Sequence, residues 1–256
     1  MTPRIQYLNV NRCRFAIRGV GQGKPLFALH GLSASGEMWL KPFERAALGN
    51  VMLIAPDARA HGLSTATTDY ADYSPSAQVR DWLAILDALE FERVALLGFS
   101  MGARVAAMLA ANHPERIAAL GIYAPPPHSM EIADAHVFVD TARAIEQRGF
   151  EAAVREAEVK RPDLLGRLRT MRPEGVAPAL GGLHSLEFAV RAPELAKIEA
   201  PTIVLGVSGD PHPLASARHY AAHIRGAAFR VTQAQDRQRD AAKLMQDLIA
   251  TAYSAG

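Results

Sequence analysis

Short apolar runs alternate with helical stretches along most of the chain, and this alternation restricts the possible folds more than any other feature. The runs with strand character are 14–17, 25–29, 51–55, 94–97, 117–123, 201–206 and 228–231. Helical stretches between most of these runs are typical of parallel strands joined by crossover helices. The sequence therefore predicts an α/β fold, with a mostly parallel central sheet and helices on both faces.

The expected helices of this alternating part are 75–89, 101–112, 214–224 and 240–253. The first has a recognisable start, because Ser74 is placed to cap it and Pro75 occupies the first helical position. The pattern of apolar positions thus agrees with the local start signal.

The interval between Tyr123 and Pro201 breaks the alternation, because it contains no strand-like run. Its expected helical pieces, separated by Gly and Pro, are 133–148, 150–159, 163–171 and 184–190. A structureless loop of this length is uncommon inside a domain. We therefore predict a core formed by residues 1–124 and 193–256, with a helical cap, residues 125–192, inserted after the sixth strand.

A G-x-S-x-G motif, Gly98 to Gly102, follows the apolar run 94–97 and opens the helix expected from Met101. At such a strand-to-helix turn, glycines avoid collisions and the serine hydroxyl is lifted into a cleft. The start of the helix also offers free backbone N–H groups to a developing oxyanion. The motif therefore predicts that Ser100 is a nucleophile.

From these residues the chain resembles the α/β-hydrolase superfamily over nearly its whole length outside the cap. Gly21 to Gly31 is similar to the third strand and the His-Gly oxyanion loop of that family. Ala55 to Ser64 resembles its Asp-x-Arg-Gly-His-Gly segment, with Ala60 in place of the usual glycine. Ala192 to Gly206 resembles the return from cap to core, and Gly209 to Pro211 the segment with the catalytic acid.

The resemblance implies that Ser100 is the nucleophile and Asp210 the acid of a catalytic triad. The backbone N–H groups of Leu32 and Met101 would form the oxyanion hole. Asp210 also has a simpler interpretation, as a turn residue before Pro211. The positions matched by His30, His61 and Asp57 are usually structural in the family.

The triad histidine of the family follows the last strand, but this chain has no histidine after His223. Asp236 best matches the missing position. A serine hydroxyl depends on an adjacent base, and His212 and His128 are the candidate replacements. The alternatives are lyase, isomerase or cyclase chemistry on the same fold, or a catalytically silent ligand-binding protein.

We predict a serine-dependent enzyme with a non-standard triad that acts on a small ester, lactone or thioester. Apolar cap residues suggest a substrate pocket, although the same spacing is typical of packing between cap and core. These residues are Met130, Val137, Phe138, Phe150, Leu164, Leu165 and Met171. The sequence implies no cofactor, and neither the substrate identity nor the oligomeric state can be read from it.

Composition excludes several other classes of function. The 28 basic and 26 acidic residues are interleaved and give a net charge of +2, so no one-sided basic surface for nucleic acid is expected. Cys13 is the only cysteine, which excludes an intramolecular disulfide and thiolate metal sites. No apolar stretch is long enough to span a membrane, and the N-terminus lacks the pattern of a signal peptide. We expect a cytoplasmic protein without a metal.

Overall fold

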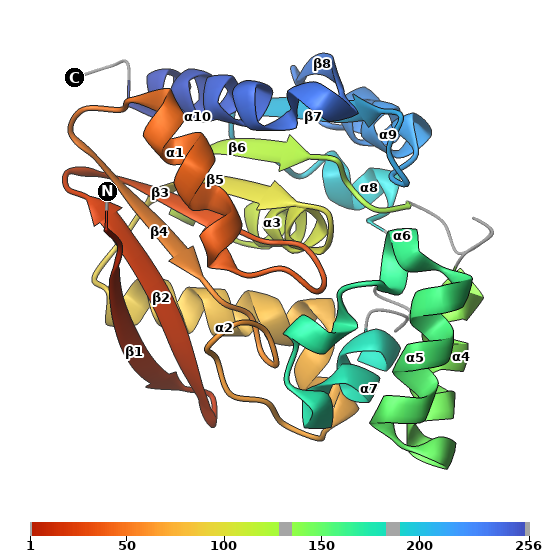
Figure 1. Cartoon of the computed structure of the whole chain (residues 1–256). Coiled ribbons are helices and arrows are strands. Elements are labelled where there is room, and N and C mark those ends of the chain that lie inside the picture. Colours follow the sequence, from red (N-terminus) through yellow and green to blue (C-terminus); the bar gives the residue numbers. More distant parts are fainter. Residues whose placement is uncertain (1, 128–134, 183–189, 254–256) are drawn as a thin grey trace.

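The computed structural model describes residues 2–127, 135–182 and 190–253, and its centre is an eight-stranded sheet (Figure 1). The strands are β1 Arg4–Val10, β2 Cys13–Gly21, β3 Lys24–Leu29, β4 Val51–Pro56, β5 Val94–Phe99, β6 Ile117–Tyr123, β7 Thr202–Ser208 and β8 Ala228–Gln233. Their order in the sheet is β1-β2-β4-β3-β5-β6-β7-β8. The strands from β4 onward are parallel, whereas β1 and β2 are antiparallel to their neighbours. The predicted α/β fold class is confirmed.

Helices cover both faces of this sheet. On one face lie α1 (Leu40–Ala46) and the C-terminal helix α10 (Arg237–Tyr253), whose buried side chains pack against the central strands. On the other face lie α2 (Pro75–Ala88), α3 (Met101–Asn112) and α9 (Leu214–His223) (Figure 1). Because the central strands are buried on both sides, they read as continuous apolar runs.

The segment between β6 and β7 is helical and contributes no strand within its described residues. Its helices are α4 Ala135–Arg148, α5 Phe150–Lys160, α6 Pro162–Leu165, α7 Pro173–Gly182 and α8 Ala192–Leu195. The first four form the lower right part of the molecule, beyond the carboxyl ends of the parallel strands (Figure 1). The exact division into core and cap stays a prediction.

An apolar cluster joins these helices to the loop that follows β4. Val154, Leu165 and Leu180 are fully buried in it, together with Ala60 and Tyr73 from that loop. The backbone of the cap also contacts the core directly: Arg172 N donates to Ala60 O at 2.7 Å, and Met171 forms a bridge with His61. The cap is therefore attached to the core beside the predicted site.

Several elements differ from the sequence-based expectation. Strand β1 was not expected, and β2 extends beyond the predicted 14–17 through Arg18, a buried charged residue that interrupts the apolar run. Helix α10 begins at Arg237 rather than 240. Instead of one helix over 163–171 there are α6 and a short 3-10 turn, while most of 184–190 lies outside the described residues.

No helix in the described ranges combines the length and the apolar character required to cross a membrane.

Candidate active site

Ser100 lies in a sharp turn between β5 and α3. Its backbone has φ +51° and ψ −116°, a left-handed conformation that is strained for a residue with a side chain. A Cβ added at Gly98 would lie 2.6 Å from Cα of Ala103, and one added at Gly102 would lie 2.5 Å from the carbonyl oxygen of Leu29. Only glycine fits at both positions, which explains the spacing of the G-x-S-x-G motif.

His212 lies beside this turn, in the loop after β7. Its Nε2 is 2.7 Å from Oγ of Ser100, and its Nδ1 contacts the Oδ1 atom of Asp210. Since a carboxylate only accepts, Nδ1 carries the proton and Nε2 is free to accept from the serine hydroxyl. The imidazole and the ring of Phe99 pack in a T-shaped arrangement, with the ring centroids 5.4 Å apart. The imidazole is thus oriented towards Ser100.

Asp210 is held from several directions. Its Oδ1 also accepts a hydrogen bond of 2.8 Å from the backbone N–H of His212, so the Asp210–Pro211–His212 segment forms a closed turn. Its Oδ2 forms an ion pair with Nη2 of Arg237, at the start of α10. The side chain of Asp210 is only 1% exposed, so both contacts lie in a site that excludes most water.

Burial lowers the pKa of His212 to about 4, because the imidazolium form loses hydration there. The imidazole is still one fifth exposed, which leaves it open to a ligand from one side. At neutral pH the side chain is uncharged and can act as a base.

The loop after β3 brings a second group of polar atoms to Ser100. Its Gly31 lies so close that an added Cβ would be 3.2 Å from Cβ of Ser100. Nε2 of His30 accepts from Ala58 N at 2.9 Å, so its Nδ1 must be the donor to Gly31 O at 2.7 Å. In a planar trans peptide, C=O and N–H point in opposite directions, so the N–H of Leu32 points away from His30.

Met101 supplies the other amide expected at an oxyanion hole. It is the first residue of α3, and its N–H therefore has no acceptor within the helix. The start of α3 also carries the positive end of the helix dipole. Both predicted amides, those of Leu32 and Met101, thus belong to segments that adjoin Ser100.

Asp57 connects several segments of the core close to the site. It is fully buried, forms an ion pair with Arg18, and accepts from the backbone N–H groups of Gly36 and Leu63 at 2.7 and 2.8 Å. It thereby ties the loop after β4 to β2 and to the segment that follows the His30 loop. This arrangement agrees with a structural role for Asp57.

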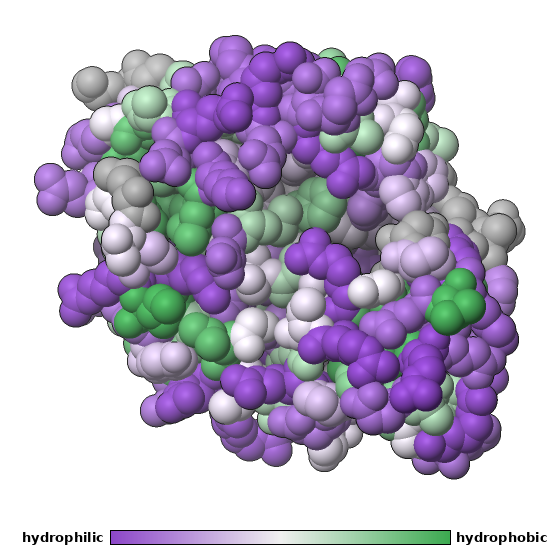
Figure 2. Space-filling view, in the orientation of Figure 1, coloured by the Kyte–Doolittle hydropathy of each residue, from purple (hydrophilic) through white to green (hydrophobic). Residues whose placement is uncertain are grey.

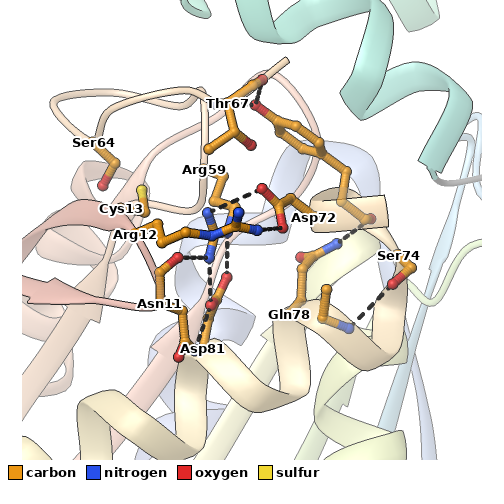
Figure 3. A network of polar contacts seen from close by, with 12 residues as sticks. Asn11, Arg12, Cys13, Arg59, Ser64, Thr67, Asp72, Ser74, Gln78 and Asp81 are labelled. Carbon is orange, nitrogen blue, oxygen red and sulfur yellow. Dashed lines mark hydrogen bonds and ion pairs between the residues drawn. The ribbon is translucent and has the colours of Figure 1, made fainter. Parts of the chain in front are cut away.

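A second polar network, with Arg59 and Asp81 buried at its centre, fixes the same loop (Figure 3). Arg59 makes two hydrogen bonds to Asp81 of α2, at 2.6 and 2.8 Å, and a third to the carbonyl oxygen of Asn11 at 2.8 Å. Asn11 in turn donates to Asp81 at 2.9 Å. Burial raises the pKa of Asp81, although its hydrogen bonds with Arg59 act in the opposite direction. The network positions the residues that flank His61.

His61 belongs to this loop and contacts the cap through its bridge with Met171. Burial lowers its pKa to about 3, and its Nδ1 is bonded to Arg59 O at 2.7 Å. Within the described part its buried Nε2 has no hydrogen-bond partner, and the ring lines a small cavity. That cavity is also lined by Ala58, Arg59, Tyr73, Gln78, Met101 and Ala179.

The surface is hollowed at the carboxyl ends of the central strands, next to the cap (Figure 2). Hydrophobic residues are visible inside this hollow, and hydrophilic residues surround most of it. The predicted cap residues contribute mainly to internal packing: Val137, Phe138, Phe150, Leu165 and Met171 belong to the apolar cluster described above. Met130 and the side chain of Leu164 lie outside the described residues.

The structure brings together Ser100, Asp210 and His212, one of the two histidines expected as a replacement base. The other, His128, lies outside the described residues. Asp236 forms an ion pair with Arg239 at 3.0 Å, and its neighbour Arg237 is the residue that contacts Asp210. Sequence reasoning missed Arg237; the basic residue directly after Asp236 was the available signal.

In the portions of the chain that the structure describes, no group of three or more His, Cys, Asp or Glu side chains is arranged to hold a metal ion.

Comparison with protein families matches residues 24–197 to the family described as alpha/beta hydrolase fold. A Bacillus subtilis (strain 168) protein provisionally named 2-succinyl-6-hydroxy-2,4-cyclohexadiene-1-carboxylate synthase is 35% identical over 109 residues, which cover 42% of this chain and 39% of that protein. The next curated relatives are matched over 37% and 33% of their lengths. The chain thus aligns with between 33% and 39% of the length of each of these relatives.

Solved structures match over nearly the whole chain. An esterase from Thermogutta terrifontis has a TM-score of 0.79 at 20% identity, with 98% of this chain and 99% of that chain covered. The enol-lactonase from Burkholderia xenovorans LB400 has a TM-score of 0.76 at 22% identity, with 96% and 100% covered. At this level of identity the likeness shows the fold alone.

Proposed function

The chain belongs to the α/β-hydrolase fold family, and from this premise we propose that it is a serine hydrolase acting on a small ester, lactone or thioester. The observation that carries the proposal is the 2.7 Å contact between Ser100 Oγ and His212 Nε2, with Asp210 on the opposite nitrogen of the ring. Acyl transfer by serine requires this order of contacts, from the nucleophile to the base and from the base to the acid that orients it.

In the first half-reaction, Ser100 Oγ attacks the carbonyl carbon and its proton passes to Nε2 of His212. The new negative charge on the carbonyl oxygen is stabilised by the N–H groups of Leu32 and Met101. Asp210 accepts from Nδ1–H and thereby stabilises the imidazolium. Collapse of the intermediate expels the alcohol or thiol, which takes the proton from Nε2 and leaves an acyl ester on Ser100.

In the second half-reaction, water replaces the leaving group. His212 removes a proton from the water as it attacks the acyl ester, and returns that proton to Oγ of Ser100 when the ester bond breaks. The products are the carboxylic acid and the unmodified enzyme. Every proton transfer uses the same nitrogen, which requires only one base in the site.

A small carbonyl substrate is supported by the surroundings of Ser100 and by the structural neighbours. The hollow beside the cap offers apolar surface to an acyl group (Figure 2). The two neighbours described above are an esterase and an enol-lactonase, whose names specify ester and lactone bonds. Both bond types need the same nucleophile and the same oxyanion donors.

A fluorophosphonate probe tests the nucleophile. We expect the wild-type protein to be labelled and Ser100→Ala to remain unlabelled. His212→Ala should be acylated by an activated ester about 10⁴-fold more slowly or worse, because loss of a triad member costs roughly this much. His223→Ala is the matched control, since this exposed histidine of α9 hydrogen-bonds only within its own helix among the described contacts.

Two results would contradict the proposal. Labelling of the wild-type protein no faster than that of Ser100→Ala would exclude covalent catalysis by Ser100. Full activity of His212→Ala would show that another group, such as His128, is the base.

A non-hydrolytic reaction is the second candidate, favoured by the synthase name of the Bacillus subtilis relative. It would use the oxyanion donors and the Ser100 hydroxyl without an acyl-enzyme. Intact-mass measurement separates the two: an acyl adduct on Ser100 during turnover of an activated ester indicates hydrolysis, and its absence favours the second candidate.

A further inference from the structure

Arg237 occupies a position that the triad of a serine hydrolase does not require. It is the first residue of α10 and directly follows the segment after β8. Its Nη2 contacts Oδ2 of Asp210, while Oδ1 of the same carboxylate receives the two N–H groups of His212. The two sides of this carboxylate therefore serve two different partners.

The burial of Asp210 strengthens its electrostatic contact with Arg237. The Asp210 side chain is 1% exposed and that of Arg237 is 38% exposed, so the guanidinium reaches inward from the surface. Charges in such surroundings are screened far less than charges in water. Arg237 therefore opposes the negative charge that Asp210 presents to His212.

Among the described residues, the other ionisable groups near this pair are either uncharged or paired with another residue. Tyr123 of β6 lies beside Arg237, and burial raises its pKa to about 12, so it is uncharged at neutral pH. Asp236 and Asp240 are both paired with Arg239, at 3.0 and 2.9 Å. Ser100, the remaining polar contact of His212, carries no charge. Among the described residues, Arg237 is thus the cation in direct contact with the Asp210–His212 pair.

We propose that Arg237 is a positioning residue that acts through Asp210: its guanidinium holds the carboxylate and offsets part of its charge, so that His212 remains an unprotonated base in mildly acid solution. The catalytic role of this coupling rests on the proposed function. The effect of Arg237 on the protonation of His212 does not depend on turnover.

The sign of the effect follows from the charges. A buried, uncompensated carboxylate stabilises an imidazolium and raises its pKa, whereas the Arg237 cation opposes this stabilisation. With Arg237 present, burial dominates and the pKa of His212 is lowered to about 4. Without Arg237, the Asp210–His212 pair should bind its proton at a pH higher by at least about one unit.

The experiment is a pH titration of ¹⁵N-labelled histidine side chains by NMR, with the His212 signal assigned by its loss in His212→Gln. Arg237→Met removes the charge, and Arg237→Lys retains it. Arg239→Met is the matched control, an exposed arginine of the same helix paired with Asp236 and Asp240. Circular dichroism defines the pH range in which each protein is folded.

We expect His212 to stay unprotonated down to pH 5 in the wild type and in Arg239→Met, and Arg237→Met to titrate at least about one unit higher than the wild type. Arg237→Lys should recover at least half of the difference. The acid limb of kcat/KM should shift by the same amount.

An unchanged His212 titration in Arg237→Met would overturn the inference, as would an equal shift in Arg237→Lys or in Arg239→Met. If Arg237→Met does not fold, Arg237→Gln replaces it, because the amide keeps a donor for Asp210 and removes the charge. Absence of hydrolysis together with the expected NMR shift would refute the proposed function and leave the charge coupling intact.

Discussion

Replacing Asp57 by Asn removes one charge from the interior while preserving the shape of the side chain. The neutral amide would face the guanidinium of Arg18, whose side chain is 7% exposed, and would leave that cation without its partner. Asp57 also accepts from Gly36 N and Leu63 N, so the NH₂ group of Asn would confront one N–H donor or the guanidinium. Asp57→Asn should therefore destabilise the fold for two reasons, the unpaired charge of Arg18 and the contact between two hydrogen-bond donors.

The expected magnitude follows from these contacts. Removing one partner of a buried ion pair typically costs about 3–5 kcal/mol. In a chain of this size each kcal/mol lowers Tm by about 2–4 °C, so the expected decrease in Tm is about 6–20 °C. The double variant Arg18→Met/Asp57→Asn removes both charges, and its loss should be smaller than the sum of the two single losses by at least about 1 kcal/mol.

Urea unfolding followed by tryptophan fluorescence measures these losses, because Trp39 and Trp82 are both buried in the core. Asp69→Asn is the control: this exposed residue caps a short 3-10 turn through Ala71 N, and its loss should stay below about 1 kcal/mol. A loss below about 1 kcal/mol in Asp57→Asn, or strict additivity in the double variant, would refute the assigned role of the Arg18–Asp57 pair.

Two further predictions concern neighbouring residues. Because the pKa of His61 is lowered from 6.5 to about 3 in the fold, the unfolded chain binds the additional proton, and stability should fall as pH decreases through this range. His61→Gln should reduce the loss of unfolding free energy between pH 6.5 and pH 5 by about 2 kcal/mol, measured in urea; an unchanged pH dependence would contradict this. Gly102→Ala should cost about 1–3 kcal/mol and greatly reduce acylation of Ser100, because the new Cβ would lie 2.5 Å from Leu29 O and 2.6 Å from His30 O. If a stably folded Gly102→Ala were labelled by a fluorophosphonate as fast as the wild-type protein, the predicted loss of acylation would be wrong.

The sequence predicted the elements whose apolar pattern is uninterrupted. Strand β5 and helices α2 and α3 were expected within about two residues of their observed ends, because β5 is buried on both faces of the sheet and each helix packs against the core through apolar positions at regular spacing. Strand β2 was expected too short because Arg18 interrupts its apolar run, and the ion pair with the distant Asp57 makes that charge tolerable. Such long-range pairing is invisible in a local pattern.

In the candidate site too, the residues that depend on local sequence could be predicted, whereas those that depend on distant contacts could not. Ser100 could be predicted because its geometry depends on five consecutive residues, and Asp210 because it follows a buried strand. His212 was one of two possible bases, since the sequence does not show which histidine is directed towards Ser100. The role of Arg237 depends on how α10 is placed against the loop after β7, and no local motif reports that placement.

The spacing of Asp210 and His212 has a consequence for motion. The two side chains are joined by one proline and by a hydrogen bond within their own turn, so they are displaced together as a small rigid body. A shift of this loop leaves the imidazole correctly aligned with its carboxylate while increasing its distance from Ser100. Reactivity of the serine would then depend on how closely this loop approaches the turn after β5, a position that the contact between Arg237 and Asp210 secures from α10.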